Sequence, residues 1–166
     1  MASPVYRLEL LVLDDALPFY PPVGTKEQLS GDNAGYDLKV VVDVKPHPTA
    51  YLVPLGVKAR MVRISEIKTI TYEEDCHFSL EARSSIYKYN YMMANGRGVI
   101  DRSYRGQLMA PMLAVGDPSK SMCVEAGTRL FQIVAPDMGY ISEVHYVSEL
   151  SATARGEGGF GSTGTK

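Results

Sequence analysis

The sequence is short of several residue types that mark common functional sites. It has no tryptophan and only two cysteines, Cys76 and Cys123, which are far apart and form no C-x-x-C pair. Neither a disulfide framework nor a zinc ribbon is therefore predicted, and we expect reduced thiols. The three histidines are scattered, and the histidine and cysteine signature of zinc deaminases is missing. Zinc chemistry is not expected.

Positive charge is also scarce, since the formal net charge is -2 at pH 7. A protein that clamps duplex DNA or lies on an anionic membrane carries a basic excess, so we expect no polymeric nucleic acid and no membrane as partner. The balance still allows a local cationic pocket for one small polyanion. No apolar run is long enough to span a bilayer, and residues 1–13 lack the features of a signal peptide. We expect a cytoplasmic protein, or a nuclear or host-cytosolic one if it is viral.

Alternation of apolar and polar residues predicts short strands along most of the chain. In the first strand Tyr6, Leu8, Leu10 and Val12 lie on one side, which is the period of a half-buried strand. Turn signals recur and no long window has helical period, so the predicted fold is an all-β sandwich or barrel in one domain. Further strands are predicted at residues 37–44, 51–57, 61–64, 68–72, 77–82, 107–115, 129–135 and 143–150, with Pro111 at an edge or a bulge.

Two segments depart from the strand pattern. Residues 85–91 contain no glycine or proline, and Arg83-Ser84-Ser85 at their start offers serine as a helix cap, so they are predicted to form the one substantial helix. Residues 64–77 are charged and irregular, which predicts an exposed loop or an extra hairpin. If the protein binds another protein, residues 64–77 are the first place to look for the contact surface.

Residues 155–166 are rich in glycine and polar groups. Arg155 can bind phosphate oxygens, Ser162 and Thr163 can donate to them, and the Phe160 ring can stack on a base. The G-x-G-x-x-G pattern at residues 156–161 does not indicate a Rossmann site, because too few residues follow it to form a helix. Composition alone leaves two interpretations open, an arm that wraps a ligand and a disordered tail.

Four internal segments combine glycine, charge and amide groups in ways that a core does not need. Each also has a purely structural explanation, namely a turn, a helix cap, a surface hairpin or a buried amide with a partner. Residues 95–104 are predicted to form a β-hairpin that sets a carboxylate beside an apolar rim, where its ionisation can be tuned. The segments are residues 34–38 with Asp37, residues 83–85, residues 95–104 with Asp101 and Tyr104, and residues 127–132 with Gln132.

Together with the tail, these segments resemble, in order, the five sequence motifs of the homotrimeric dUTPase family. The most specific matches are Gly-Val-Ile-Asp-x-x-Tyr-Arg-Gly at residues 98–106 and Arg-Gly-x-Gly-Gly-Phe-Gly-Ser-Thr-Gly at residues 155–164. The resemblance implies a jelly-roll-like β-barrel over residues 1–150 and a flexible C-terminal arm, residues 151–166, that closes over the active site. It also implies a homotrimer in which each active site takes its nucleotide hairpin, its phosphate-binding motifs and its arm from three different subunits.

The activity implied by the resemblance is Mg2+-assisted hydrolysis of dUTP to dUMP and pyrophosphate by attack of water on the α-phosphorus. This reaction limits uracil incorporation into DNA and supplies dUMP for dTMP synthesis. Asp101 would be the general base, Gln132 would lie near the α-phosphate or the attacking water, and Asp37 would hold Mg2+ through its waters. The base and sugar would be bound by Asn95, Gly98, Val99, Ile100, Tyr104 and Phe160, with Tyr104 leaving no room for a 2′-hydroxyl. The phosphates would be bound by Arg83, Ser84, Ser85, Gln132, Arg155, Gly161, Ser162 and Thr163.

A few positions differ from the commonest pattern of that family. Ala82 replaces a frequent proline, Phe131 replaces a small alanine, and Arg102 stands where an acid is often found. Two other hypotheses were weighed. A dCTP deaminase-like enzyme of the same fold lacks its catalytic glutamate here, because Pro111 occupies that position. A non-catalytic nucleotide-sensing or interaction protein is disfavoured by the intact Asp101.

Overall fold

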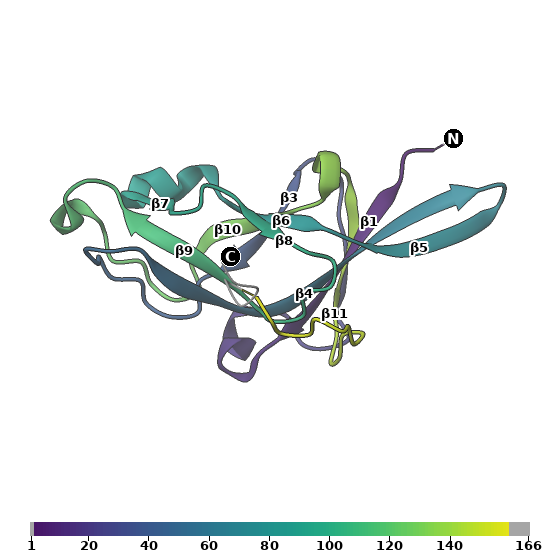
Figure 1. The fold of residues 1–166 in the computed structure, drawn as a ribbon, viewed down its shortest axis with the longest axis horizontal. Coiled ribbons are helices and arrows are strands. Elements are labelled where there is room, and N and C mark those ends of the chain that lie inside the picture. The colour runs from purple at the N-terminus through teal and green to yellow at the C-terminus, as the bar shows by residue number, and fades with distance from the viewer. Residues whose placement is uncertain (1, 160–166) are drawn as a thin grey trace.

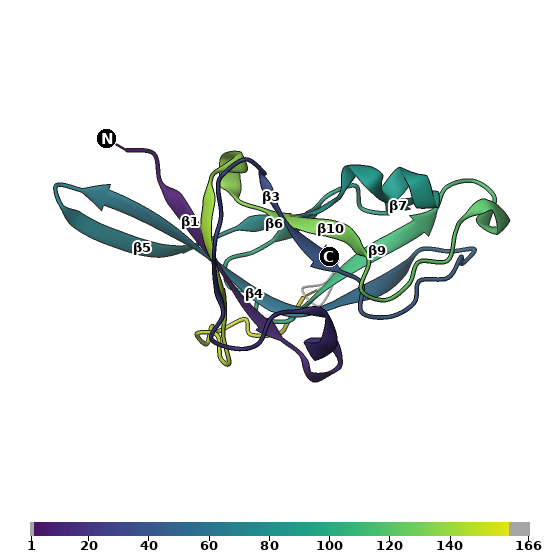
Figure 2. The ribbon, with the colours of Figure 1, turned by 180° about the vertical axis from the view of Figure 1, so that it is seen from behind.

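Two β-sheets form the fold, which Figures 1 and 2 show from opposite sides. A computed structural model describes residues 2–159. The larger sheet has seven strands, in the spatial order β2 (Lys26–Gln28), β11 (Ile141–Tyr146), β1 (Val5–Val12), β4 (Tyr51–Ile67), β9 (Gln107–Ala114) and β7 (Tyr91–Met93), with β5 (Ile70–Cys76) paired to β4. The smaller sheet has four strands, in the order β3 (Gly35–Lys39), β10 (Arg129–Val134), β6 (Phe78–Ala82) and β8 (Gly98–Ile100).

The connections are short and contain 3-10 helices in place of α-helices. These helices are η1 (Asp14–Phe19), η2 (Ser84–Tyr89), η3 (Pro118–Lys120) and η4 (Pro136–Met138). Strands β1 and β11 run parallel, whereas β1 and β4, and β4 and β9, are antiparallel. The prediction of an all-β, jelly-roll-like fold is confirmed. None of the helices in the described part of the chain is long and apolar enough to cross a membrane.

The core collects the inward-facing side chains of both sheets into one apolar cluster. In β1 the residues Tyr6, Leu8 and Leu10 are buried, as the alternation of the sequence predicts. In β9 every second residue from Leu108 to Ala114 is buried in the same way. Each fully buried leucine contributes roughly 1.5–3 kcal/mol relative to an exposed one. The alternating pattern therefore accounts for which face of each strand points inward.

Strand β4 joins two strands that the sequence predicts separately at residues 51–57 and 61–64. The break expected at residues 58–60 is absent, and the irregular position is Gly56, which has a positive φ of 70°. A Cβ atom at this position would lie 2.3 Å from the Ala16 Cβ atom, so only glycine fits. The register between β4 and β9 shifts between Pro54 and Lys58. The glycine thus marks an irregularity within one long strand, and not its end.

Residues 64–77 contribute to a long hairpin formed by β4 and β5. The prediction of an extra hairpin is confirmed, and Figure 1 shows it projecting from one end of the molecule. The predicted strand at residues 68–72 is wrong in its bounds, because Lys68 and Thr69 form the tip and both have positive φ. Strand β5 begins only at Ile70. Two non-glycine residues adopt the left-handed turn, and so the sequence lacks the usual hairpin signal.

Two further strand predictions need correction. The strand predicted at residues 37–44 ends at Lys39, and Val42, within the predicted range, is 44% exposed. The chain turns there because Asp43 accepts a hydrogen bond from the Ala126 amide and Val44 forms an isolated bridge with Val124. The strand predicted at residues 143–150 runs instead from Ile141 to Tyr146.

Pro111 does not lie on an edge strand, because β9 is flanked by β4 and β7. Its carbonyl accepts a hydrogen bond from the Ala94 amide, just beyond the end of β7. The nitrogen and carbonyl of one residue point to the same side of a strand, so the missing N–H faces the region past β7. The proline therefore removes no hydrogen bond from the pairing with β4.

The helix predicted at residues 85–91 is a six-residue 3-10 helix, η2, that begins at Ser84. It ends at Tyr89, because the next residue, Asn90, has a positive φ of 64° that stops the turn. Its N-cap residue is Arg83, with no capping side-chain hydrogen bond, and Ser84 and Ser85 lie inside the helix, so the serines do not act as the predicted N-cap. The predicted β-hairpin at residues 95–104 is also wrong, because β7 belongs to the larger sheet and β8 to the smaller one. The turn between them carries the chain from one sheet to the other.

Candidate active site

A charged pocket opens where β3 and β10 meet the start of η2. Its volume is about 660 Å³, and its polar lining includes Asp37, Arg83, Ser84, Arg129 and Gln132. Strand β10 pairs with β3 on one side and with β6 on the other, and this register sets Gln132 opposite Asp37. Backbone pairing thus brings together polar residues from three distant segments of the sequence.

Cations outnumber acids in the charged pocket. Lys39, Arg83 and Arg129 face a single carboxylate in the described lining, that of Asp37. The Arg83 Nε atom lies 3.0 Å from Asp37 Oδ1, and the Arg129 Nη1 atom lies 3.3 Å from Asp37 Oδ2. Both carboxylate oxygens therefore face guanidinium groups, and a positive excess remains. This charge balance suits an anion with several negative charges.

Gln132 is held in the wall of the charged pocket by its neighbours. Its Nε2 atom donates to the Ala82 carbonyl at 3.2 Å, which is the defined partner expected for an inward amide. A Cβ atom on Gly35 would lie 2.0 Å from the Gln132 Oε1 atom. Glycine is therefore required at position 35 for the amide to keep this orientation.

A second and narrower hollow, the turn pocket, lies beside the turn that joins β7 and β8. Its volume is about 160 Å³, and its lining includes Asn95, Ile100, Asp101, Tyr104 and Arg155. Strand β8 is the last strand of the smaller sheet. Its outer edge therefore presents main-chain N–H and C=O groups that no strand of the described chain pairs. Such an edge can hydrogen-bond a flat ligand that carries its own donors and acceptors.

Tyr104 forms one wall of the turn pocket and is only 6% exposed. Its hydroxyl donates to the Gln107 carbonyl at 2.7 Å, and burial raises its pKa, so the hydroxyl stays protonated. Two glycines lie against the ring. A Cβ atom would come within 2.4 Å of the hydroxyl oxygen at Gly106 and within 2.6 Å of Cε1 at Gly159. The absence of side chains at these positions lets the backbone approach the ring closely.

Residues 153–159, which we call the tail clasp, cover the turn pocket of their own chain. Arg155 donates through Nη1 to Asp101 Oδ2 and through Nε to the Gly158 carbonyl at 2.6 Å. Its guanidinium carbon lies 5.5 Å from the centroid of the Tyr104 ring. The Arg105 amide donates to the Gly156 carbonyl at 2.7 Å. In this structure Arg155 is therefore bound to Asp101, the candidate general base. It does not line the charged pocket, where the predicted phosphate ligands Arg83, Ser84 and Gln132 lie.

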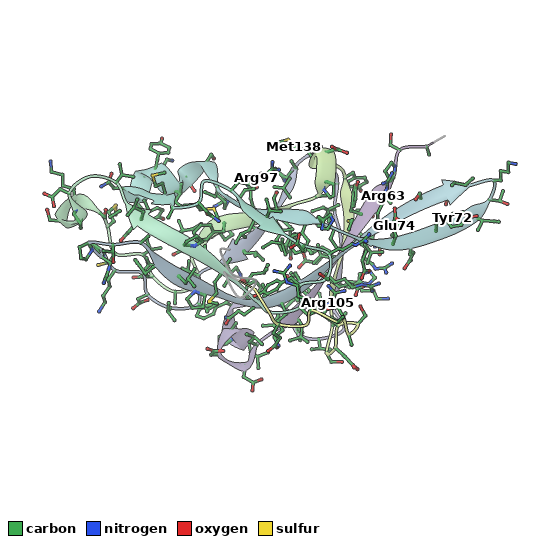
Figure 3. All side chains as sticks on the ribbon, in the orientation of Figure 1. Arg63, Tyr72, Glu74, Arg97, Arg105 and Met138 are labelled. Carbon is green, nitrogen blue, oxygen red and sulfur yellow. The ribbon has the colours of Figure 1, made fainter. Side chains whose placement is uncertain are left out.

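Two residues that hydrogen-bond the backbone of Arg102, the residue after Asp101, were missing from the sequence predictions. The first is Arg105, which is 7% exposed and donates to the Ser151 carbonyl, the Arg102 carbonyl and the Asp75 carboxylate. Figure 3 labels it beside the C-terminal segment. It therefore joins the loop after β8 to β5 and to the tail and fixes these three segments relative to one another. The available signal was an arginine within the motif at residues 98–106.

The second overlooked residue is His77, which the sequence analysis set aside as one of three scattered histidines. Its Nδ1 atom lies 3.7 Å from Asp101 Oδ1. The same nitrogen accepts a hydrogen bond from the Arg102 amide at 3.0 Å. Only the pairing of β6 with β8 brings the two residues together, so no local sequence signal indicated the contact.

The predicted site residues are divided between the two pockets. The charged pocket is lined by Asp37, Arg83, Ser84 and Gln132. The turn pocket is lined by Asn95, Gly98, Val99, Ile100, Asp101, Tyr104 and Arg155. The two linings share no residue, so one described chain does not bring Asp101 and Gln132 into a single cavity. Ser85 lies in neither described lining, and Phe160, Gly161, Ser162 and Thr163 lie outside the described residues.

The donor set of the charged pocket bears on metal binding. No group of three or more His, Cys, Asp or Glu side chains within residues 2–159 could hold a metal ion. The one carboxylate of the pocket, on Asp37, already faces two guanidinium groups. This arrangement fits a hard cation that arrives on an anionic ligand and contacts the protein through water, because such a cation needs few protein ligands.

Comparisons with known proteins agree on one family. A family model described as dUTPase matches residues 26–164. A deoxyuridine 5′-triphosphate nucleotidohydrolase of Leptospira interrogans is 34% identical over 136 residues, which cover 79% of this chain and 84% of the relative. An enzyme of the same name from Chlamydia trachomatis is 29% identical over 150 residues, covering 90% of this chain and 91% of the relative.

A solved structure has the same fold. The dUTPase of Staphylococcus bacteriophage 80alpha aligns with a TM-score of 0.52 at 16% identity, covering 89% of this chain and 96% of that one. A second structure of the phage enzyme, with dUpNHpp, aligns with a TM-score of 0.51 at 19% identity and covers 95% of this chain and 98% of that one. At this level of identity the likeness establishes the fold.

Proposed function

The chain belongs to the dUTPase family and is a dUTP nucleotidohydrolase, and from that premise we propose a mechanism in which Asp101 activates a water molecule for attack on the α-phosphorus. The observation that carries the proposal is the turn pocket. It sets a carboxylate beside an unpaired strand edge and a buried tyrosine ring. A reaction at a deoxynucleotide needs a general base, groups that hydrogen-bond the nucleobase and a surface that packs against the sugar. These three elements can supply them.

In this mechanism the Asp101 carboxylate accepts a proton from water as the water oxygen bonds to the α-phosphorus. The bond from that phosphorus to the bridging oxygen breaks, and the electron pair leaves with pyrophosphate. A general base of this kind contributes typically 10²–10⁴-fold to the rate. The Asp101 side chain is half exposed in the turn pocket, so both a nucleotide and water can reach it.

The outer edge of β8 supports selection of the base. Its backbone donors and acceptors, together with Asn95, would pair with uracil, whereas cytosine would present a donor where uracil presents an acceptor. Each buried group left unpaired in this way costs about 1–3 kcal/mol. The Tyr104 ring lies in the same pocket and is supported from behind by Gly106. We assign it to the deoxyribose, where a 2′-hydroxyl would collide with the ring.

The charged pocket supports binding of the triphosphate. Arg83 and Ser84 would contact the phosphates, and Gln132 would lie near the α-phosphate. Lys39 and Arg129, which the sequence analysis did not assign, add positive charge to the same lining. Asp37 would hold Mg2+ through water, and the ion would neutralise charge on the triphosphate when bound. These assignments, and that of Ser85, rest on the family motifs and on the charge balance of the pocket.

In the proposed mechanism the tail clasp must rearrange before Asp101 can act as the base. Arg155 pairs with Asp101 in the described chain, so the base carries a cation beside it. In the proposed mechanism a triphosphate draws Arg155 away from the carboxylate, because phosphate oxygens bind a guanidinium at least as well as a carboxylate does. Phe160, Gly161, Ser162 and Thr163 would follow and close over the nucleotide.

We infer a homotrimer with shared active sites from the separation of the two pockets. The outer face of the larger sheet supports it, because β4, β7 and β9 expose apolar side chains there. Leu52 pairs with Pro111 across the sheet and Met92 pairs with Leu113, and Leu52 and Met92 are each 45% exposed. An apolar face of this kind is typical of a surface buried between subunits.

Light scattering tests the trimer. The wild type is expected to have three times the mass of one chain, and Leu52→Asp is expected to lower both the mass and the activity. A fully active monomer would overturn the shared site.

If the enzyme has this mechanism, its product dUMP feeds dTMP synthesis and its consumption of dUTP limits uracil in DNA.

A nucleotide panel tests the function itself. The protein is incubated with dUTP, UTP, dTTP or dCTP and Mg2+, and pyrophosphate, nucleoside monophosphate and ammonia are measured. We expect pyrophosphate and dUMP from dUTP alone. Release of ammonia from dCTP would indicate a deaminase instead, and binding of dUTP with no product would indicate a nucleotide sensor.

A further inference from the structure

His77 is the single residue between β5 and β6, at the point where the chain passes from the larger sheet to the smaller one. Strand β6 pairs antiparallel with β8, and Phe78 lies opposite Ile100. Extending this register by one residue sets His77 opposite Asp101. The contact between the two side chains is therefore a consequence of strand pairing.

One ring nitrogen of His77 takes part in both contacts. The Nδ1 atom accepts a hydrogen bond from the Arg102 amide at 3.0 Å, so the neutral ring carries its proton on Nε2. The same Nδ1 atom lies 3.7 Å from Asp101 Oδ1, beyond hydrogen-bond distance. The neutral ring thus anchors the residue that follows Asp101 and makes no ion pair with the carboxylate.

A protonated ring would act in the opposite way. Its Nδ1–H could no longer accept from the Arg102 amide, and the nearest acceptor described for it is Asp101 Oδ1. Asp101 Oδ2 already accepts from Arg155. A carboxylate with a cation beside each oxygen is a weak base, because both cations stabilise its ionised form.

The other titratable groups around His77 come from several elements. Two of the acids are matched by cations, since Asp75 pairs with Arg60 and Arg105, and Glu74 lies 3.7 Å from Arg63. Asp137 is a further carboxylate in the same hollow. Burial raises the pKa of Cys76 to about 11 and also raises that of Tyr6, so both stay neutral at moderate pH. The titratable residues that share the hollow with His77 are Tyr6, Arg63, Glu74, Asp75, Cys76, Arg102 and Asp137.

We propose that His77 is a positioning residue for Asp101, and that turnover requires its neutral imidazole. This inference rests on the proposed role of Asp101 as the general base. The neutral ring holds the chain directly after Asp101 in place, and protonation both releases that anchor and pairs the carboxylate with a second cation.

Three variants separate these effects. His77→Asn keeps an acceptor oxygen where Nδ1 stands but cannot titrate, and His77→Leu removes the acceptor as well. His47→Asn is the matched control, because the described contacts of the exposed His47 are hydrogen bonds with Thr49 and a ring contact with Tyr51 at 5.5 Å between centroids. Thermal melting establishes that each variant folds.

The readout is the pH profile of kcat/KM for dUTP hydrolysis. The wild type and His47→Asn should lose activity on the acidic side of the profile, where the His77 ring gains its proton. His77→Asn should stay within about threefold of the wild type at higher pH, since the hydrogen bond is retained, and should lack that acidic loss. His77→Leu should lower kcat about 10- to 100-fold with little change in KM, because the base is misplaced. A wild-type acidic limb in His77→Asn, or full activity in His77→Leu, would overturn the proposal.

A measurement without turnover separates this proposal from the proposed function. In a pH titration followed by NMR, the Arg102 amide proton should shift as the His77 ring gains its proton, in the wild type and in the inactive Asp101→Asn variant alike. If the chemical shift of the Arg102 amide proton did not change as the His77 ring gained its proton, the positioning contact would be disproved. Failure of the function would appear elsewhere, as an Asp101→Asn variant that still hydrolyses dUTP.

Discussion

The charged pocket and the turn pocket differ in what holds their side chains in place. Asp37 and Gln132 stand on β3 and β10, which pair along their length, so the backbone ladder sets their positions. Asp101 and Arg155 stand on a turn between two sheets and on a tail segment, and side-chain contacts hold them together. The charged pocket is therefore the preformed surface and the turn pocket the adjustable one, which in the proposed mechanism bind the phosphates and the nucleoside. Substrate-dependent motion should therefore be concentrated in the turn pocket.

The largest expected effect comes from Asp101→Asn in the turn pocket. The amide keeps the size of the side chain but accepts no proton, so kcat should fall about 1000-fold, within the usual range for a lost general base. Steady-state kinetics with dUTP measures this loss, and thermal melting should be nearly unchanged. An active variant would contradict the assignment of the base and leave the chemistry to the charged pocket.

Of the two pockets, the charged pocket should be the less tolerant of a larger side chain in its lining. Gly35→Ala sets a methyl group against the Gln132 amide, and such overpacking costs typically about 1–3 kcal/mol. Urea unfolding measures the cost. In a Gln132→Ala background the same substitution should cost much less, because the obstructing amide is gone. Equal costs in both backgrounds would refute the proposed clash.

Without substrate, loss of the Arg155 side chain should affect the turn pocket alone. Arg155→Ala removes the hydrogen bonds to Asp101 and Gly158 and the contact with the Tyr104 ring. Because charge-assisted hydrogen bonds contribute about 1.5–3 kcal/mol, amide exchange in residues 153–159 should accelerate at least about tenfold. Exchange in β3 and β10 should not change. Unaltered exchange in the tail would mean that other contacts hold it.

The smallest expected effect is a loss of stability at alkaline pH that comes from Cys76, the last residue of β5. Burial raises the pKa of Cys76 from 9.0 to about 11, so folding favours the protonated thiol. The stability that this thiol contributes is complete below pH 9 and is lost as the pH rises toward 11. Urea midpoints should therefore fall more over this interval in the wild type than in Cys76→Ala. Cys123→Ala serves as the control, and an equal fall in all three proteins would exclude the effect.

Some of the site could be predicted because its signals are local. The apolar alternation of β1 and β9 predicted both the strands and their buried faces, since side chains on a strand alternate between two faces. Glycine, charge and amide groups within short segments indicated Asp37, Arg83, Asp101 and Gln132. These residues do line the two pockets. By contrast, the hairpin expected at residues 95–104 failed, because strand patterning does not indicate which sheet a strand joins.

By itself, the sequence determined the all-β class, the family and the residues that can carry the chemistry, because local periodicity and side-chain type encode them. Only the tertiary structure decided that His77 faces Asp101, that Gly35 leaves room for Gln132 and that Arg105 joins β5 to the tail. Each of these contacts joins residues far apart in the chain. Their partners are set by strand register and by packing between sheets, which depend on the whole chain at once.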